Sequence, residues 1–286
     1  MERENLTKKE IIELAVQEYL ATDESERSAA ATARKYGINR KTIVTHVKKM
    51  GLGHMVTQHH NKVKFDNTVF EKIDTEEKAY WLGFLFADGY VTANDNHVVL
   101  SISKNDEDHI QKYVDFLRYS KAYSIKKNGL KKDGTQLYLV EVGVGDDKFK
   151  NDVVRCGCIP NKSLILKFPN KEIFQDESLI RHFVRGYIDG DGSLGLYNGR
   201  WKSKIEYVQI IGTKHFLEGI QDVCGITGYI SLKHPETGNT DTYILKYTNL
   251  KAFNVAKFFY ENSTIYLTRK YNIYEEMCRN KIEQKR

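Results

Sequence analysis

Two aspartates close two copies of one short pattern. Residues 81–89 read WLGFLFADG and residues 184–192 read VRGYIDGDG, so Asp88 and Asp191 hold the same place in both copies. Small residues recur after four positions in each copy, which puts them on one helix face, where two helices can approach closely. If the helices pack through these faces, the two carboxylates meet at one end. A divalent cation would offset their repulsion, activate water and stabilise a leaving phosphate oxygen.

The Asp-Gly that closes each copy predicts a helix end, because glycine supplies a left-handed turn at low cost. The run from Trp81 to Ala87 is apolar all round, as in a buried helix, and it is too short to span a membrane. For a single copy, a buried helix with an ordinary C-terminal cap would be the simpler interpretation. Two matched copies favour a functional site instead.

The elements that must position these aspartates also occur twice. Each motif helix is followed by two predicted strands, a helix, two more strands and a further helix, over residues 75–170 and 171–286. Alternation of polar and apolar residues predicts the strands, and turn sequences such as KKDG at residues 131–134 join them. The predicted fold class is therefore α+β, with tandem pseudo-symmetric αββαββα repeats and antiparallel sheets. A duplicated order of elements supports this interpretation independently of the motifs.

A small all-α module is predicted before the repeats. Residues 6–20 are expected to form one helix, and residues 28–35 and 39–50 two more, with Gly37 between them. This order resembles a helix-turn-helix DNA-binding domain over residues 1–51, followed by a linker at residues 52–74. A helical module with a solvated basic face is the alternative. Residues on the last helix are candidates for contacts with bases and phosphates: Asn39, Arg40, Lys41, Thr42 and Thr45.

The composition sets limits on the class of protein. The 286 residues carry a formal net charge of +6, and the pI is about 8.9, which suits an anionic partner. The chain has no apolar stretch of about 18 residues, and its N-terminus lacks the apolar region of a secretory signal. We therefore expect an intracellular protein in the cytoplasm that makes no membrane contact. The four cysteines lack zinc-site spacing and are expected to be free thiols.

The paired motifs resemble those of the LAGLIDADG homing endonucleases in their single-chain, two-repeat form, and the resemblance extends over residues 75–275. It implies a monomer with saddle-shaped sheets that cuts double-stranded DNA at a long target site. It also implies Mg²⁺, or another divalent cation such as Mn²⁺, held by Asp88 and Asp191 with the carbonyls of Ala87 and Gly190. The first copy has Phe86 where the family's motif has an earlier aspartate, but that position is not a metal ligand in the family.

The resemblance also implies one basic catalytic group in each repeat. In the family, a lysine after the last helix of each repeat orders solvent and offsets charge in the transition state. Lys162 and Lys270 occupy these places here, with Arg269 as a competitor to Lys270. The alternative is that these side chains bind backbone phosphates only.

One face of each sheet must cover helices, which leaves the other face for the DNA major groove. Polar and basic residues of the strands are therefore candidates for DNA contact, although each could equally be a solvated strand residue. In the first repeat they are Ser101, Ser103, Lys126, Gln136 and Tyr138. In the second repeat they are Tyr197, Arg200, Lys202, Lys204, Glu206 and Gln209.

Two other functions fit the same scaffold. A maturase would bind intron RNA, and a non-cleaving regulator would bind DNA through the helix-turn-helix. Loss of either motif aspartate would favour these functions, and the presence of both favours an endonuclease. The chain shows no self-splicing junction residues, so we expect an intron-encoded or free-standing protein rather than an intein.

Overall fold

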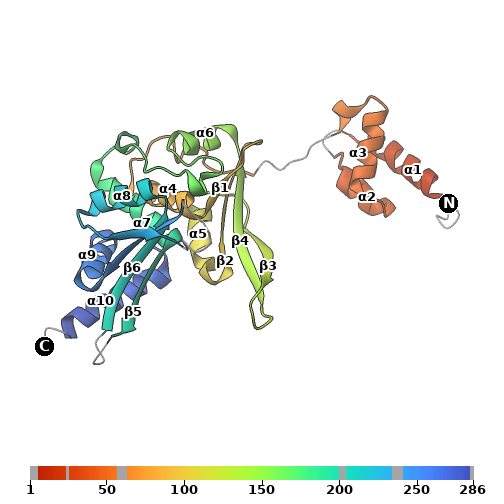
Figure 1. The fold of residues 1–286 in the computed structure, drawn as a ribbon. Coiled ribbons are helices and arrows are strands. Elements are labelled where there is room, and N and C mark those ends of the chain that lie inside the picture. Colours follow the sequence, from red (N-terminus) through yellow and green to blue (C-terminus); the bar gives the residue numbers. More distant parts are fainter. Residues whose placement is uncertain (1–5, 24–25, 57–62, 200–203, 234–240, 284–286) are drawn as a thin grey trace. The chain divides into compact units, whose positions relative to one another are not determined.

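The computed structural model describes residues 6–23, 26–56, 63–199, 204–233 and 241–283. The chain divides into two compact units, residues 1–63 and 64–286, each with its own hydrophobic core (Figure 1). Within the described ranges, no helix combines the length and the apolar character needed to cross a lipid bilayer.

The described part of the first unit contains three α-helices. They are α1 Lys8–Ala21, α2 Ala29–Tyr36 and α3 Arg40–Lys49. Thr7 and Glu10 form a capping box at the start of α1, and the Asn39 side chain accepts a hydrogen bond from the Lys41 amide at the start of α3. Gly37 ends α2 with a φ of 65°, a left-handed conformation that glycine adopts without strain. The assignment of this unit as a helix-turn-helix domain stays a prediction.

Two repeats of the same topology form the second unit (Figure 1). The first contains α4 Glu76–Asp88, β1 Gly89–Val91, β2 His97–Ser103, α5 Glu107–Phe116, β3 Ser124–Leu130, β4 Gln136–Gly145 and α6 Asp147–Arg155. The second contains α7 Ile180–Asp191, β5 Gly192–Asn198, β6 Lys204–Gly212, α8 Lys214–Cys224, β7 Tyr229–Leu232, β8 Tyr243–Thr248 and α9 Asn249–Tyr260. In the described residues, the strands form two antiparallel sheets, ordered β1-β2-β4-β3 and β5-β6-β8-β7. The predicted α+β fold with tandem αββαββα repeats is thus confirmed.

A further long helix, α10 Thr268–Glu283, follows the second repeat and was not predicted from the sequence. It packs against β6: the Glu206 carboxylate accepts a hydrogen bond from Asn280 at 2.6 Å and pairs with Lys281 at 2.8 Å. Two short 3₁₀ helices also matter for the site. These are η3 Lys104–Asp106 and η4 Lys162–Leu164.

Residues 64–74 belong to the second unit rather than to a linker. Val69, Phe70 and Ile73 are buried in its core, and Ile73 forms an isolated β-bridge with Phe174. The boundary between the units falls before Lys64, so the predicted linker over residues 52–74 extended too far. The linker was predicted because residues 52–74 are rich in charged residues and histidine, but Val69, Phe70 and Ile73 within this range pack in the core.

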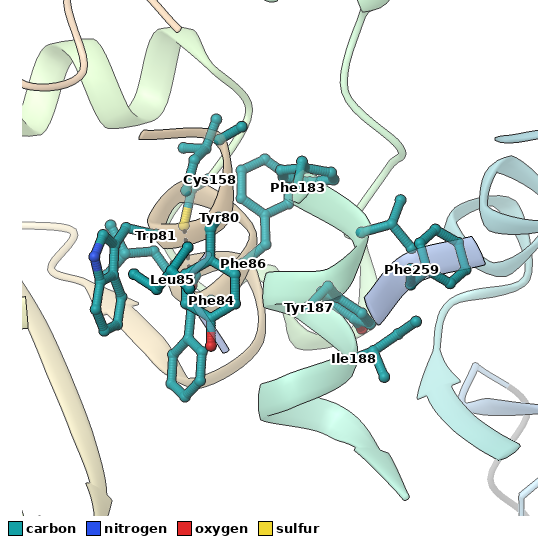
Figure 2. Close-up of a cluster of buried hydrophobic side chains, with 14 of the residues drawn as sticks. Tyr80, Trp81, Phe84, Leu85, Phe86, Cys158, Phe183, Tyr187, Ile188 and Phe259 are labelled. Atoms are coloured by element: carbon teal, nitrogen blue, oxygen red, sulfur yellow. Dashed lines mark hydrogen bonds between the residues drawn. The ribbon is translucent and has the colours of Figure 1, made fainter. Parts of the chain in front are cut away.

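Helices α4 and α7 pack against each other through their glycines. A Cβ atom added at Gly83 would lie 1.8 Å from the carbonyl oxygen of Phe183, and one at Gly186 would lie 2.0 Å from that of Tyr80. Glycine in a helix costs about 1 kcal/mol relative to alanine, and this backbone contact explains why the cost is accepted in both helices. Buried aromatic side chains surround the contact (Figure 2). The packing predicted from the four-residue spacing is therefore present.

Candidate active site

Asp88 and Asp191 are the last residues of α4 and α7. The glycines that follow are extended, with φ of −75° at Gly89 and −94° at Gly192, and they begin β1 and β5. The predicted left-handed caps are therefore wrong. Glycine is required for a different reason, because a Cβ atom at Gly89 would lie 2.4 Å from the carbonyl oxygen of Leu85. Each chain segment thus passes directly from helix into strand at the aspartate.

The two helix ends lie against each other. A Cβ atom at Gly190 would lie 2.3 Å from Cβ of Ala87 and 3.2 Å from Oδ2 of Asp88. The Asp88 carboxyl group therefore lies beside the last turn of α7, one residue before Asp191. The structure thus brings together the four residues that the resemblance implied as metal ligands.

Both motif carboxyl groups are in an environment that disfavours their charge. Although the Asp88 side chain reaches solvent, the surrounding protein displaces much of its water, and this desolvation together with the negative charge of Asp191 raises the pKa of Asp88 to about 6. Desolvation also raises the pKa of Asp191, while Lys162 and Lys270 act in the opposite direction. A bound cation would relieve both effects, since it favours the ionised carboxylates.

Lys162 and Lys270 lie near these carboxylates but donate to backbone oxygens. The Lys162 Nζ donates to the carbonyls of Ala87 at 3.0 Å and Gly89 at 2.7 Å, at the end of α4. The Lys270 Nζ is buried and donates at the end of α7 to three carbonyls, those of Ile188 (2.7 Å), Asp189 (2.6 Å) and Gly192 (2.6 Å). Burial lowers the pKa of Lys270 to about 8. Both lysines therefore complete the C-terminal end of a motif helix.

A third aspartate, Asp189, belongs to the site and was not among the predicted site residues. It is 1% exposed, and its carboxylate accepts hydrogen bonds from the hydroxyls of Tyr80 at 2.7 Å and Tyr260 at 2.6 Å. It also accepts one from the backbone amide of Leu267 at 2.7 Å. The network fixes the start of the segment that carries Arg269 and leads into α10. The sequence did contain a signal for this role: Asp189 lies among the apolar residues of a helix that was predicted to be buried, where a carboxylate needs hydrogen-bond partners.

Two cavities are each lined by residues of both α4 and α7. The first cavity, of about 290 Å³, is lined by Phe84, Asp88, Ser101, Ile102, Ser103, Asp106, Leu139, Asp189, Gly190, Leu267 and Arg269. The second cavity, of about 210 Å³, is lined by Phe86, Ala87, Lys162, Ser163, Leu164, Leu166, Tyr187, Asp191, Ile211, Gly212, Thr213 and Thr242. Among the described residues, the lining of the first cavity includes Asp88 and the cation Arg269, and that of the second includes Asp191 and the cation Lys162, so each cation comes from the end of the other repeat.

The register of the first sheet separates the predicted DNA-facing residues into two groups. Ser103 and Lys126 both pair with Leu139, so they share the face that is not covered by helices. Gln136 and Tyr138 instead alternate in phase with the buried Val140. Their assignment to the open face was therefore wrong, although Tyr138 is still 38% exposed. Ser101 also follows the open phase, as predicted, and so do Glu141 and Tyr90, which were not predicted.

The second sheet shows the same division. Gln209 pairs with Ser193 and Lys246 on the open face, and Tyr197 alternates in phase with Ser193. Lys204 and Glu206 lie on the opposite side, toward α10, where Lys204 pairs with Glu276 at 2.9 Å. These two predictions were wrong because β6 carries apolar residues in both phases, so alternation alone does not choose a face. Tyr229 and Lys246 pair with each other on the open face and were not predicted, and Arg200 and Lys202 lie outside the described residues.

In the first unit, the predicted DNA contacts lie on or beside α3. Ile43 and Val47 face the core of the unit, which leaves the other side of the helix at the surface. Exposed or half-buried positions are held by Asn39, Arg40, Lys41, Thr42 and Thr45. The arrangement gives this helix a basic face, and its contact with DNA stays a prediction.

A match to a known protein family covers the second repeat. Residues 178–259 match the family model described as LAGLIDADG-like domain. This match confirms the inferred resemblance for the second repeat: residues 178–259, from just before α7 to the end of α9, are similar to LAGLIDADG-like domains. No curated protein matches the chain in sequence.

Several solved structures are similar in fold to the chain. The meganuclease I-SmaMI bound to uncleavable DNA is 15% identical with a TM-score of 0.48, covering 72% of this chain and 90% of its own. The I-LtrWI LAGLIDADG homing endonuclease bound to target DNA is 12% identical with a TM-score of 0.47, covering 74% and 92%. I-SmaMI bound to an uncleaved DNA target in the presence of calcium ions is 16% identical with a TM-score of 0.46, covering 72% and 91%.

Proposed function

We propose that this protein is a site-specific DNA endonuclease that hydrolyses one phosphodiester bond in each strand of double-stranded DNA. The observation that carries the proposal is the placement of Asp88 and Asp191 at adjacent ends of two packed helices, each followed directly by a strand of a separate sheet. The open face of each sheet would lie in a major groove, and the aspartates would face the backbone between the two half-sites. We further propose that the protein acts as a monomer, since one chain holds both halves.

The residues at the helix ends fit a hard divalent cation such as Mg²⁺ or Mn²⁺. In the described residues, no group of three or more His, Cys, Asp or Glu side chains is placed to hold a metal. Two carboxylates still suit Mg²⁺, which keeps several waters and commonly takes its remaining ligands from substrate phosphates. When bound, such an ion would supply an activated water and neutralise charge on the phosphate.

This chain's own residues have three tasks in that reaction. Asp88 and Asp191 would hold the divalent cation. Lys162 and Lys270 fix the carbonyls at the helix ends, and thereby the aspartates that precede Gly89 and Gly192. Lys162, which also lines the second cavity, is placed to offset charge there.

Genomic DNA of the source organism, incubated with the purified protein and Mg²⁺, tests the proposal. We expect breaks at one or a few sequences spanning on the order of 20 base pairs, found by sequencing the new ends. Asp88→Asn, Asp191→Asn and chelation of the cation should each abolish the breaks, because each removes part of the metal site. Full cutting by both variants would exclude this mechanism. Tight DNA binding without breaks would support the non-cleaving regulator, and a preference for intron RNA would support the maturase.

The first unit is proposed to lengthen the DNA contact. Replacing Arg40 and Lys41 together with alanine should weaken binding of the recovered target and lower the salt dependence of the binding constant, since two phosphate contacts are lost. The cut positions should not change, because the aspartates lie in the second unit. Unaltered affinity at both low and high salt would contradict a DNA role for α3.

A further inference from the structure

The two cavities are built differently at equivalent positions. Pairing of Gly89 with Leu100 and of Gly192 with Ile210 aligns the two repeats. By this alignment, Asp106 of the first cavity corresponds to Phe216 of the second repeat, and Asp189 corresponds to Phe86. Arg269, which precedes Lys270, corresponds to Asn161, which precedes Lys162. The first cavity therefore has three charged groups whose equivalents in the other half of the pseudo-symmetric unit are apolar or neutral, and of these equivalents Phe86 lines the second cavity.

Arg269 is held by one edge of its guanidinium group. Its Nε donates to both carboxylate oxygens of Asp106, at 2.9 and 3.1 Å, and the Asp106 residue is 8% exposed. The terminal nitrogens of Arg269 make no hydrogen bond to any other described residue, and 55% of its side chain is exposed. A guanidinium fixed at Nε with two amino groups open to solvent has the geometry that binds phosphate oxygens in pairs.

The segment around Arg269 is attached to the first repeat at two more points. Thr268 Oγ1 donates to Asp108 at 3.0 Å, and Lys112 Nζ donates to the carbonyl of Tyr266 at 3.3 Å. Arg269, which follows the second repeat, therefore lines the cavity that contains Asp88 of the first repeat. The cavity has room for a phosphate group and its water, since a water molecule occupies about 30 Å³ in the liquid.

We propose that Arg269 binds the scissile phosphate in the first cavity and that Asp106 is a positioning residue that orients its guanidinium group. This inference rests on the proposed endonuclease function. The second cavity contains neither group, and Lys162 supplies its cation. The two DNA strands are therefore cut with different residue requirements: one depends on the Asp106–Arg269 pair and the other on Lys162.

The experiment measures cutting of each strand separately. The probe is the duplex recovered from the genomic digest, carrying a different label on each strand, under single-turnover conditions with Mg²⁺. We expect Arg269→Ala to slow one strand about 100-fold, and Asp106→Asn to slow the same strand about tenfold, because the guanidinium is present but misplaced. Arg269→Lys should restore little, since it lacks both the anchored Nε and the paired amino groups. Lys162→Ala should slow cutting of the opposite strand more than cutting of the strand that depends on Arg269.

Asp108→Asn is the matched control, because it alters a carboxylate that contacts the same segment through Thr268 but does not line the cavity. It should change either rate less than about twofold, and the thermal unfolding midpoints of all variants should show that they are folded. Equal slowing of both strands by Arg269→Ala, or unchanged rates in Arg269→Ala and Asp106→Asn, would overturn the inference while leaving the endonuclease function intact. A wild-type protein that cuts neither strand would overturn the proposed function, and this inference with it.

Discussion

The ends of α4 and α7 have the same backbone path but are stabilised by different chemistry. At the end of α4, Phe86 packs edge-on against Phe183 of α7, with ring centroids 4.9 Å apart. At the end of α7, the equivalent contact joins Asp189 to Tyr80 of α4 by a hydrogen bond of 2.7 Å. The two contacts are related by the pseudo-symmetry of the repeats, and one is apolar where the other is polar.

The lysines at the two helix ends also differ, in burial and in the number of hydrogen bonds that they donate. Lys162 is half-buried and donates to two carbonyls, whereas Lys270 is 2% exposed and donates to three. The two repeats therefore have the same backbone path but different side chains at the helix ends. The α4 end is partly open to solvent, and the α7 end has a buried polar network. Buried polar networks are costly when incomplete, so the α7 end should be the more sensitive half to substitution.

The helix contact itself should show no such asymmetry, and it should give the largest effects. Gly83→Ala and Gly186→Ala should each lower the free energy of unfolding by about 3 kcal/mol or more, because the added Cβ would meet backbone that cannot move aside. Chemical denaturation measures the change. Gly143→Ala is the control, since its Cβ would lie 3.6 Å from Val99 at an ordinary contact distance. Tolerance of either helix substitution would mean that the helices are farther apart.

Removal of the buried carboxylate should be the next largest effect. Asp189→Ala should lower the free energy of unfolding by about 3 kcal/mol, because it leaves two hydroxyls and the Leu267 amide without their acceptor. In the other half, Phe86→Leu should cost only about 1 kcal/mol, as a hydrophobic replacement in an apolar cluster. Urea titrations of the two variants give the comparison. Similar costs at both positions would show that the polar network adds nothing beyond packing.

Removal of the lysine at the α7 end should likewise lower the free energy of unfolding more than removal of the lysine at the α4 end. Lys270→Ala should lower the free energy of unfolding by about 2 kcal/mol, because three carbonyl oxygens at a buried helix end lose their donor. Lys162→Ala should cost about 1 kcal/mol or less, since water can reach the carbonyls of Ala87 and Gly89. Thermal unfolding of both variants without DNA measures this difference. A larger loss for Lys162→Ala would reverse our description of the two ends.

The smallest effect should be a gain in stability. The pKa of Asp88 is about 6 in the folded protein against an ordinary value of 3.8. The folded state therefore binds more protons than the unfolded state between these values, and its free energy of unfolding falls as the pH rises through this window. Asp88→Asn should be about 1 kcal/mol more stable than wild type at pH 7, a figure reduced to allow for solvent screening. The gain should vanish below about pH 4, where wild-type Asp88 is protonated in both states.

A divalent cation provides the control for that measurement. Mg²⁺ should raise the unfolding midpoint of the wild-type protein at pH 7, because binding to the folded state stabilises it. The same ion should have little effect on Asp88→Asn. Equal stabilisation of both proteins by Mg²⁺ would place the cation away from Asp88.

Local patterns in the sequence were sufficient for most of the elements and for placing Asp88 and Asp191 together. The spacing of Gly83 and Ala87, repeated at Gly186 and Gly190, predicted two helices in contact with an aspartate at the end of each. These features depend on residues close together in the chain, and such patterns determine helix faces and helix ends. The order of strands and helices followed from the same local signals. The helix α10 was missed because its polar surface does not produce a clear apolar stripe.

Only the tertiary structure decided which strand face is open, which residues share a cavity, and how the two halves differ. Lys204 and Glu206 were placed on the open face until the position of α10 showed that they face this helix. Asp106 and Arg269 are far apart in sequence, and so are Asp189 and Tyr80, and no local pattern connects either pair. Contacts of this kind arise when separate elements pack, and their energies depend on burial and charge that a linear sequence does not specify.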